Sequence, residues 1–312
     1  MTAMVFDDRD RPALSQLGTA PVFGAAPVGA LVWHEGIRWH VRITGSGPAM
    51  LLLHGTGASS DSFDGLAKHL SRRHTIVAPD LPGHALTHAP RRFVPSLPNM
   101  ARALGRLLAE LEVSPVAVVG HSAGAAVLAQ MALDRSIAPR LLVGVGAALF
   151  PIPSLAGAVL RPMAKLLSRT PGIVSSRIGS TVAVERLLRG VGSSLDSEGI
   201  ERYRQLSSRP DHVRATLEMM ASWDLEPLFR ALPRLRSRVL LIAGRNDRAI
   251  SIAQQRAVVA RLPHGALVEM AGAGHLLHEE RPEETAELIT RHEKESSSGE
   301  GPSLDEDGRI VG

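Results

Sequence analysis

The sequence predicts an α/β domain in which helices flank a mostly parallel central sheet. Short apolar runs recur along the chain, and segments with apolar residues at i, i+3 and i+4 separate them. This alternation of strands and helices is typical of a parallel sheet whose strands are joined by crossover helices. The 312 residues, of which 44% are hydrophobic, suffice for one large domain with a smaller insertion.

The expected elements follow one another at short intervals. Two apolar–polar stretches within residues 31–43, around Glu35-Gly36, predict a β-hairpin. Further strands are expected at 49–53, 75–78, 116–119, 141–145, 239–243 and 266–270. Helices are expected at about 63–70, 100–111 and 125–133.

The alternation stops at Phe150-Pro151-Ile152-Pro153. From there to about Trp223, only helical patterns interrupted by Pro and Gly appear. A helical block inserted between two strands of a parallel sheet predicts a lid over the carboxyl edge of that sheet. We therefore expect a core at 31–150 and 224–292, and a helical cap at 151–223.

Both ends of the chain are expected to lie outside the core. Residues 13–33 carry no charge, as in a signal peptide or membrane span, but Pro and Gly interrupt them and three Asp residues precede them. We predict a flexible N-terminal extension at 1–30 that docks on a partner or a membrane surface, and no transmembrane segment. Ser, Gly and acidic residues dominate after His292, which predicts a disordered acidic tail at 293–312.

Composition excludes several classes of site. The chain has no Cys, so it has no disulfide, thiolate nucleophile or Cys-ligated metal, which suits the cytoplasm. The net charge of +4 comes with only ten aromatic residues and no Arg-rich run among them, so we expect no nucleic-acid binding. Basic residues exceed acidic ones between Arg161 and Arg214. This excess suits a carboxylate-bearing small molecule, a protein partner, or simply solvated helix faces.

The pentapeptide Gly120-His121-Ser122-Ala123-Gly124 is the most informative motif. It lies between a predicted buried strand and a predicted helix. A Gly-x-Ser-x-Gly turn in that context reverses the chain sharply and leaves the serine oxygen exposed at the bend. The alternative is a structural turn whose hydroxyl caps the helix. We take Ser122 as the candidate nucleophile of acyl transfer.

A serine nucleophile needs a base, and the base needs an acid that orients it. In folds with this turn, the chain order is Ser, acid, His. Asp247 directly follows the strand expected at 239–243, and residues 141–184 contain no acidic residue that competes with it. Asp224 opens a helix and is interpreted as an N-cap.

The base is expected in the loop after the last strand. Gly272-Ala273-Gly274-His275 supplies it there, and its small residues allow His275 to reach across the sheet edge. His278 is the competing candidate, but it falls just before a helix start at Pro282-Glu283-Glu284. No third ligand accompanies the two histidines, so we expect no metal site.

An oxyanion hole needs two backbone N–H donors. The residue after the nucleophile, Ala123, gives one. The loop His54-Gly55-Thr56-Gly57, after an early strand, gives the other through Thr56, although it also fits a plain Gly-rich turn. The remaining histidines of these motifs are interpreted as structural, pinning loops by hydrogen bonds: His54, His84 and His121.

With nucleophile, acid, base and oxyanion loop in this order, the chain resembles the α/β-hydrolase fold. Longer segments make it similar to the magnesium-chelatase accessory proteins of bacteriochlorophyll biosynthesis, over roughly residues 36–288. These segments are 37–41, 51–59, 79–84, 96–101, 119–126, 219–225 and 274–282. One departure is Ala85, which stands where many members of the fold have glycine.

The resemblance implies a role in magnesium insertion into protoporphyrin IX in photosynthetic bacteria. It leaves two hypotheses open: a serine hydrolase acting on an ester, thioester or amide, or a non-catalytic accessory protein that binds a porphyrin or the chelatase subunits and retains the triad as scaffold. A generic esterase or lipase is a further alternative. No cofactor is expected. For a porphyrin, an apolar cap chamber would hold the ring and cap arginines would meet its carboxylates: Arg161, Arg177, Arg186 or Arg189.

Overall fold

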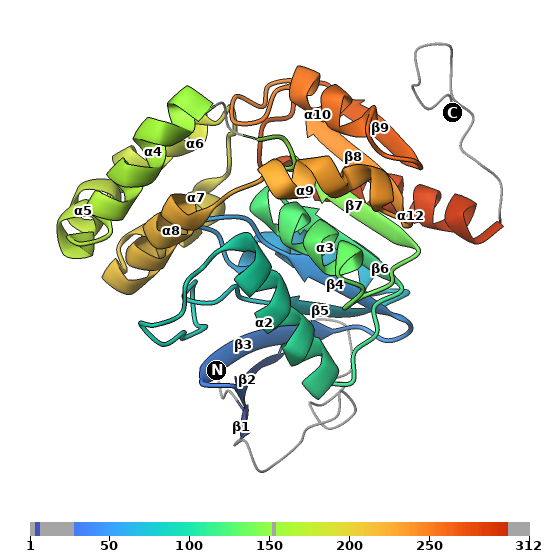
Figure 1. Cartoon of the computed structure of the whole chain (residues 1–312), viewed down its shortest axis with the longest axis horizontal. Coiled ribbons are helices and arrows are strands. Elements are labelled where there is room, and N and C mark those ends of the chain that lie inside the picture. The colour runs from blue at the N-terminus through green and yellow to red at the C-terminus, as the bar shows by residue number, and fades with distance from the viewer. Residues whose placement is uncertain (1–3, 7–27, 152–153, 299–312) are drawn as a thin grey trace.

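A computed structural model describes residues 4–6, 28–151 and 154–298 (Figure 1). The described strands form one sheet in the order β1-β2-β3-β5-β4-β6-β7-β8-β9. β3 is antiparallel to both of its neighbours, and every other adjacent pair is parallel. The strands are β1 (Met4–Phe6), β2 (Val28–His34), β3 (Ile37–Thr44), β4 (Ala49–Leu53), β5 (Thr75–Pro79), β6 (Ala117–His121), β7 (Leu141–Val145), β8 (Arg238–Gly244) and β9 (Gly265–Met270).

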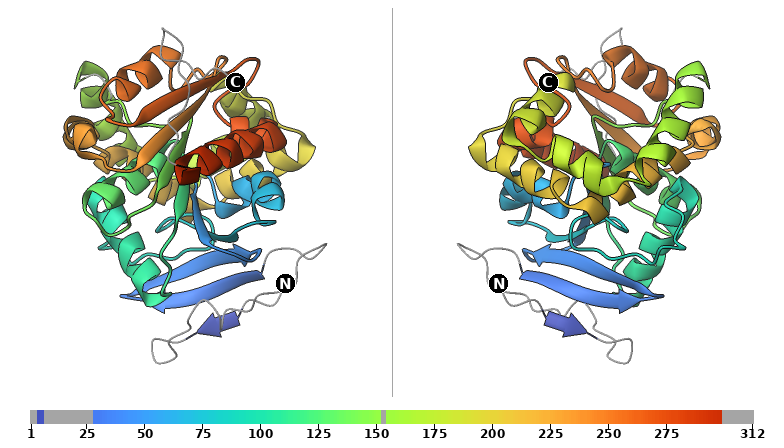
Figure 2. Two further views of the ribbon diagram at one scale, coloured as in Figure 1. Left: turned by 90° about the vertical axis from the view of Figure 1, so that its right-hand side faces the viewer. Right: turned by 90° about the vertical axis from the view of Figure 1, so that its left-hand side faces the viewer.

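Helices cover both faces of this sheet, as the two side views show (Figure 2). They are α1 (Asp64–Leu70), α2 (Leu97–Glu110), α3 (Ala123–Leu133), α9 (Glu226–Ala231), α10 (Ile252–Val259), α11 (Leu277–Glu280) and α12 (Pro282–Ser298), with 3-10 turns at η2 (Ser60–Phe63) and η3 (Leu232–Arg234). The central strands are buried on both sides because their side chains alternate between two cores. In β4, Leu51 and Leu53 join the core under α2, α3, α9 and α10. Met50 and Leu52 join the core under α1, α11 and α12.

Most elements expected from the sequence are confirmed within a few residues at their ends. β4 and β7 have the expected bounds. The hairpin is confirmed by the pairing of β2 with β3, and Glu35 and Gly36 both take positive φ at its turn. β6 extends beyond the apolar run to His121, because Gly120 and His121 continue the pairing with β7.

The predicted ends of the chain need correction. Met4–Phe6 form β1, which pairs with β2, and β2 itself begins at Val28, inside the predicted extension. At the other end, α12 continues to Ser298, so the first six residues of the predicted tail are helical. The acidic composition wrongly predicted disorder for these six residues, because glutamate is a good helix former. In addition, the Glu293 carboxylate pairs with the His74 imidazole at 2.8 Å. Residues 7–27 and 299–312 lie outside the described residues.

Between β7 and α9, the chain forms five helices that lie together on one side of the α/β core, at the left of Figure 1. We call them the helical layer: α4 (Ser154–Leu167), α5 (Pro171–Ile178), α6 (Thr181–Gly190), α7 (Ser197–Ser207) and α8 (Pro210–Ser222). The absence of strands between Phe150 and Trp223 is thus confirmed for the part of this stretch that the structure describes. Nor does any helix among the described residues have the length and apolarity to cross a membrane.

Candidate active site

Ser122 lies at the bend between β6 and α3, in a backbone conformation that L residues rarely adopt (φ 49°, ψ −117°). Its backbone N–H donates to Val145 O at 2.9 Å, which ties the bend to β7. The flanking glycines allow this geometry. A Cβ on Gly120 would lie 2.4 Å from Ala125 N, and one on Gly124 would lie 2.2 Å from Leu53 O. The strained turn expected from the motif is therefore present.

Asp247 lies in the loop after β8, two strands along the sheet from Ser122. Its Oδ1 accepts hydrogen bonds from the backbone N–H groups of Ala249 and Ile250, at 2.8 and 2.9 Å. Its Oδ2 lies 2.8 Å from His275 Nδ1. The Asp247 side chain has no solvent exposure. Both carboxylate oxygens thus have hydrogen-bond partners, which hold the carboxylate in one orientation.

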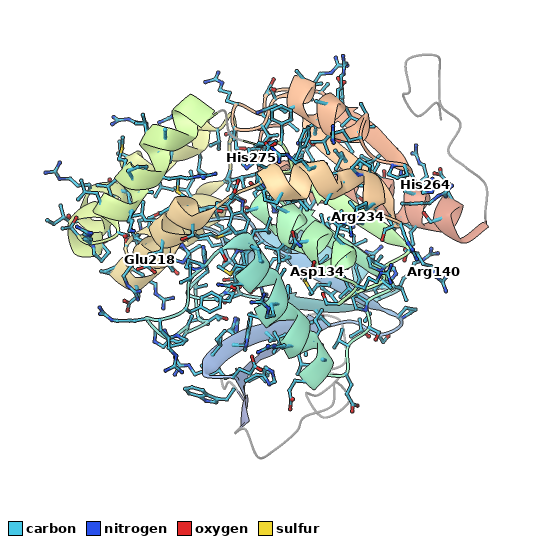
Figure 3. The ribbon with its side chains drawn as sticks, viewed as in Figure 1. Asp134, Arg140, Glu218, Arg234, His264 and His275 are labelled. Atoms are coloured by element: carbon cyan, nitrogen blue, oxygen red, sulfur yellow. The ribbon has the colours of Figure 1, made fainter. Side chains whose placement is uncertain are left out.

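His275 follows β9 and lies where the helical layer meets the α/β core (Figure 3). Because the Asp247 carboxylate can only accept in this hydrogen bond, Nδ1 is the donor, and in the neutral imidazole Nε2 then has the lone pair. The peptide group between His275 and Leu276 is also held at both of its polar atoms. His121 Nε2 lies 3.1 Å from His275 O, and Leu276 N donates to Ser193 Oγ at 2.8 Å. An imidazole with a free Nε2, oriented by a buried carboxylate, is equipped to act as a base.

The structure brings the three predicted residues to the carboxyl ends of β6, β8 and β9, on one edge of the sheet. The His121 ring, next to Ser122, lies 4.8 Å from the His275 ring between centroids. A Cβ on Gly146, at the end of β7, would lie 3.1 Å from His275 Nδ1 and 3.3 Å from Asp247 Oδ2. Ser122 Oγ has no hydrogen-bond partner in the described part of the chain, so its bond to His275 stays a prediction.

The loop expected to complete the oxyanion hole passes directly beside Ser122. A Cβ on Gly55 would lie 3.0 Å from Ser122 Cβ. The next residue, Thr56, donates its hydroxyl hydrogen to Met219 Sδ at 3.7 Å. Ala123 is the first residue of α3, so its N–H has no partner within the helix. The positions suit two backbone donors, and their role stays a prediction.

Three histidines interpreted as structural are buried next to these loops. His54 holds two loops together, since its Nδ1 donates to Gly55 O at 2.8 Å and its Nε2 accepts from Leu81 N at 2.9 Å. His84 Nδ1 lies 3.3 Å from Pro82 O. Burial lowers the pKa of His54, and it holds the pKa values of His84 and His121 well below the usual range. These imidazoles are therefore neutral, and each hydrogen-bonds a backbone group of a loop next to the site, as expected.

His278, the competing base, lies inside α11 with a fully buried ring. Neither ring nitrogen has a hydrogen-bond partner in the described residues, and the ring packs 5.0 Å from Phe63 and 4.5 Å from His121 between centroids. Burial lowers its pKa to about 3. A base needs an orienting acid and access to the nucleophile, and His278 has neither. The described residues contain no group of three or more potential metal ligands.

Asp224 was interpreted as an N-cap, and its Oδ1 accepts from Glu226 N, the first residue of α9, at 3.2 Å. It is not the N-cap itself, because Leu225 occupies that position. Asp224 also pairs with Arg161 at 3.4 Å. It therefore joins α4 to the start of α9.

The bonds that join the helical layer to the loops of the site were not predicted from the sequence. His212 of α8 bridges two loops: Nδ1 accepts from Ala85 N at 3.0 Å, and Nε2 donates to Gly57 O at 3.1 Å. Arg248 N donates to Val191 O at 3.2 Å, beside Asp247. These partners are far apart in the chain and belong to no recognisable motif.

A carboxylate in the Pro79-Asp80 segment was also not identified as important. Asp80 is buried and accepts from the backbone N–H of Ser60 at 2.7 Å and from His40 Nδ1 at 2.8 Å. Burial acts to raise its pKa, but the His40 hydrogen bond, together with nearby imidazoles and the Ser60 N–H, outweighs burial and lowers it. Asp80 therefore organises the loops next to the site.

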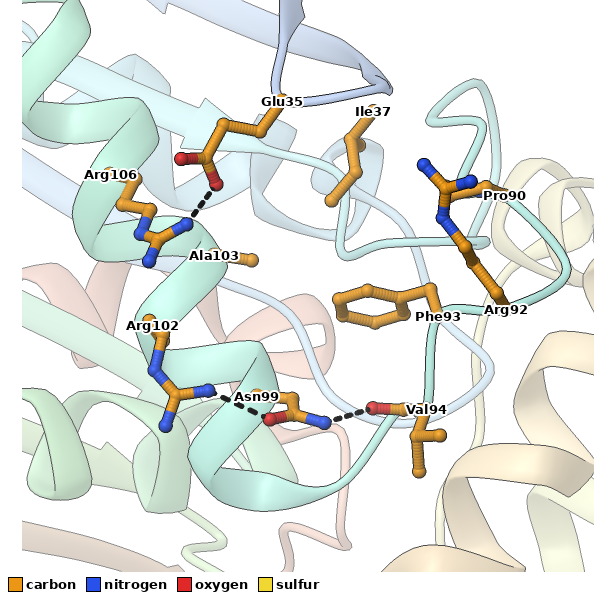
Figure 4. A pocket seen from close by; sticks show the side chains of 10 residues that line it. All are labelled: Glu35, Ile37, Pro90, Arg92, Phe93, Val94, Asn99, Arg102, Ala103 and Arg106. Atoms are coloured by element: carbon orange, nitrogen blue, oxygen red, sulfur yellow. Dashed lines mark hydrogen bonds and ion pairs between the residues drawn. The ribbon is translucent and has the colours of Figure 1, made fainter.

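One surface cavity of about 340 Å³ lies away from this site, between the β2–β3 turn, the loop at 90–94 and α2 (Figure 4). Phe93 and Ile37 contribute apolar surface to it. Of its arginines, Arg106 pairs with Glu35, and Arg102 donates to Asn99 Oδ1 at 3.0 Å. None of the predicted site residues lines it.

Comparison with known proteins agrees with this architecture. The chain is 42% identical to the magnesium-chelatase 30 kDa subunit of Rhodobacter capsulatus over 248 residues, which cover 78% of this chain and 86% of that protein. The structure of a protein from Acinetobacter baumannii described as a putative lipase superimposes with a TM-score of 0.74 at 18% identity, covering 88% of this chain and 93% of that one. An alpha/beta hydrolase fold protein from Burkholderia ambifaria superimposes with a TM-score of 0.72 at 25% identity, covering 83% and 95%.

The family model described as "Alpha/beta hydrolase family" matches residues 50–288, which include every predicted site residue. Strands β5 to β9, the strained serine turn and the buried Asp247–His275 pair all fall within this match. The chain therefore belongs to the alpha/beta hydrolase family.

Proposed function

We propose that the chain is a serine hydrolase that cleaves an ester, thioester or amide through Ser122, His275 and Asp247. His275 Nε2 accepts the hydroxyl proton as Ser122 Oγ attacks the substrate carbonyl carbon. The negative oxygen that forms is stabilised by the Thr56 and Ala123 N–H groups. Collapse of the intermediate breaks the bond to the leaving group, which takes its proton from His275.

The second half of the reaction returns the enzyme to its starting state. His275 takes a proton from water as the water oxygen attacks the acyl carbon. The acyl–Ser122 bond then breaks, and Ser122 Oγ recovers its proton from His275. Asp247 keeps its charge throughout and stabilises the imidazolium form that exists in each half-reaction.

The observation that carries the proposal is the Asp247–His275 hydrogen bond. Its 2.8 Å length, the absence of solvent around Asp247, and the two N–H donors on Oδ1 all favour one orientation of the imidazole. If the Asp247–His275 pair were purely structural, it would not require a strained serine at the end of β6. The φ of 49° at Ser122 is a cost of the kind that is retained at reactive turns.

The helical layer, which corresponds to the predicted cap at 151–223, is proposed to enclose the substrate. α8 contacts the oxyanion loop through Met219 and His212, and the segment after α6 contacts the Asp247 and His275 loops through Val191 and Ser193. A layer held at these points can exclude water from the acyl-enzyme. An apolar chamber between this layer and the sheet edge is part of the proposal.

Labelling with a fluorophosphonate probe tests the hydrolase. We expect the wild-type chain to be labelled at Ser122, and Ser122→Ala to abolish the label. Ser176→Ala is the matched control, since that exposed hydroxyl only bonds Ile173 O, and labelling should be unchanged. A folded wild-type chain that the probe leaves unlabelled would refute the catalytic use of Ser122.

A second function is favoured by the 42% identity to a magnesium-chelatase subunit. We propose that the chain assists magnesium insertion into protoporphyrin IX during bacteriochlorophyll biosynthesis, with chelatase subunits as partners, in the cytoplasm or at a membrane surface. In this role, the bound small molecule is a porphyrin beneath the helical layer. Its carboxylates would reach the rim of the helical layer and meet the four cap arginines there, all of which are at least partly exposed.

Titration of protoporphyrin fluorescence separates the two functions. Under the accessory role, binding is saturable, survives Ser122→Ala, and weakens when the cap arginines become glutamine: Arg161, Arg177, Arg186 and Arg189. Absence of saturable binding together with strong probe labelling at Ser122 would leave a generic esterase whose link to the pigment pathway is indirect. Binding without labelling would leave an accessory protein with the triad as scaffold.

A further inference from the structure

Exposed apolar side chains gather on the helical layer. Of the twelve large hydrophobic residues that are exposed in the described chain, nine lie between Val159 and Met220. Single exposed hydrophobic residues are normal on protein surfaces, but a contiguous group marks an interaction site. The nine are Val159, Leu160, Met163, Leu166, Leu167, Ile173, Val182, Leu187 and Met220.

α4 contributes five of these residues, and their spacing places them on one face. They occupy positions i, i+1, i+4, i+7 and i+8 from Val159, which span about a third of the helix circumference. A different face, marked by the buried Ala164, packs inward, and α4 has its main helix–helix contact with α8. Leu166, at 63% exposure, therefore belongs to an apolar stripe that the rest of the described chain leaves uncovered.

The exposed surface of the same helices is strongly cationic. Residues 157–190 contain six basic side chains and a single acidic one, Glu185. Glu185 pairs with Arg189 at 3.4 Å, and Arg161 pairs with Asp224. The other four make no ion pair within the described part of the chain: Lys165, Arg169, Arg177 and Arg186.

Apolar and cationic residues also alternate on single helices. On α5, exposed Ile173 and Arg177 are four residues apart, and on α6, exposed Val182 and Arg186 are four residues apart. Residues at i and i+4 project from the same side of a helix. Each helix therefore presents an apolar side chain next to a cation, as amphipathic helices do at a membrane interface.

We propose that the outer faces of α4, α5 and α6 dock on the surface of an anionic phospholipid bilayer. The apolar side chains would enter the acyl boundary, and the unpaired cations would contact lipid phosphates. A second copy of the chain fits this surface less well, because a two-fold contact pairs the same patch with itself and would bring two cationic faces together. The docking requires no spanning helix and does not depend on hydrolysis.

Docking has a consequence for the proposed active site. α8 packs against α4 and α5, and it also bonds the oxyanion loop through His212 and Met219. A bilayer held against the helical layer would favour apolar substrates dissolved in the membrane. This consequence rests on the proposed hydrolase function, whereas the docking itself does not.

Co-sedimentation of the full chain with vesicles tests the docking. Vesicles of phosphatidylcholine alone are compared with vesicles that also contain phosphatidylglycerol. We expect at least tenfold stronger partitioning onto the anionic vesicles, and loss of this preference at high salt. Using Ser122→Ala in parallel should give the same result, which separates docking from hydrolysis.

Variants divide the apolar and electrostatic contributions. Replacing Leu166, Ile173 and Val182 by serine should weaken partitioning at least tenfold on both kinds of vesicle, while circular dichroism and thermal unfolding stay as in wild type. Replacing Lys165, Arg177 and Arg186 by glutamine should weaken it only on anionic vesicles. The matched control is Leu86→Ser with Val94→Ser, two comparably exposed residues outside the helical layer, which should change nothing.

Three results would overturn the proposal. The first is no vesicle binding by the wild type, and the second is equal loss of binding in the control and the apolar variant. The third is a dimer that forms without lipid in sedimentation equilibrium and that the apolar variant dissociates, which would assign the face to a second copy of the chain.

Discussion

The helices that cover the sheet and the helices of the helical layer place their apolar residues in opposite ways. In α3, eight of eleven residues are buried against the sheet and its neighbours. In α4, five large apolar residues are exposed instead. The first arrangement holds the loops that carry Ser122, Asp247 and His275 in fixed positions. The second leaves apolar surface available for binding. The α/β core therefore supports the proposed chemistry, and the helical layer is the region suited to recognition.

The largest expected effect comes from the core loops. Asp247→Asn should lower kcat/KM on a p-nitrophenyl ester by about 10⁴-fold, because an amide can donate to Nδ1 and so favour the wrong imidazole tautomer. Stopped-flow or spectrophotometric rates measure this loss. Asp224→Asn, at the junction with the helical layer, serves as the control and should stay within a few-fold of wild type. Activity of Asp247→Asn above about a tenth of wild type would contradict the assigned role.

The next largest effect is on stability, which should respond differently to truncation of an apolar side chain in the core and in the helical layer. Leu52→Ala, in the fully buried centre of β4, should lower the free energy of unfolding by about 2–5 kcal/mol, since it leaves a cavity between packed layers. Leu166→Ala on α4 should change it by no more than about 0.5 kcal/mol, because the side chain is already in solvent. Urea denaturation measures both. A large loss for Leu166→Ala would show that this residue packs in solution and would remove the contrast.

Acidification should act on the junction between the regions. Burial lowers the pKa of His212 to about 4, from an ordinary value of 6.5, so the folded state binds fewer protons than the unfolded state between these values. Stability contributed by neutral His212 is therefore present above pH 6.5 and is lost as the pH falls towards 4. The full contribution is about 3 kcal/mol.

Urea denaturation at pH 7 and pH 4.5 measures this dependence. His212→Gln cannot titrate, so its stability should fall less than that of wild type over the same range. Protonation of Nδ1 would also break the bond from Ala85 N, which links α8 to the core. Parallel pH profiles for the two proteins would mean that other buried groups account for the acid sensitivity.

The two regions also differ in how far the sequence predicts them. The residues proposed for catalysis follow predicted strands, and a parallel sheet gathers strand ends on one edge, so Ser122, Asp247 and His275 could be placed together. The Asp247–His275 hydrogen bond was expected and is observed. By contrast, His212 and Thr56 bond partners more than a hundred residues away, and no local pattern encodes such pairings. Helical periodicity located the helical layer but did not reveal which faces stay exposed.

The smallest expected effect concerns Ala85, the residue that departs from the family pattern. Its φ of 44° lies in the left-handed region, which costs an L residue with a Cβ about 1 kcal/mol and glycine almost nothing. Ala85→Gly should therefore raise the free energy of unfolding by up to about 1 kcal/mol, less the entropy that glycine adds to the unfolded chain. Ala103→Gly, inside α2, should have the opposite sign and lower stability by about 1 kcal/mol. Urea denaturation of both variants measures these changes. If both variants lose stability, the backbone at Ala85 does not hold a left-handed conformation in solution. The bond from Ala85 N to His212 would then not fix the helical layer to the core in this geometry.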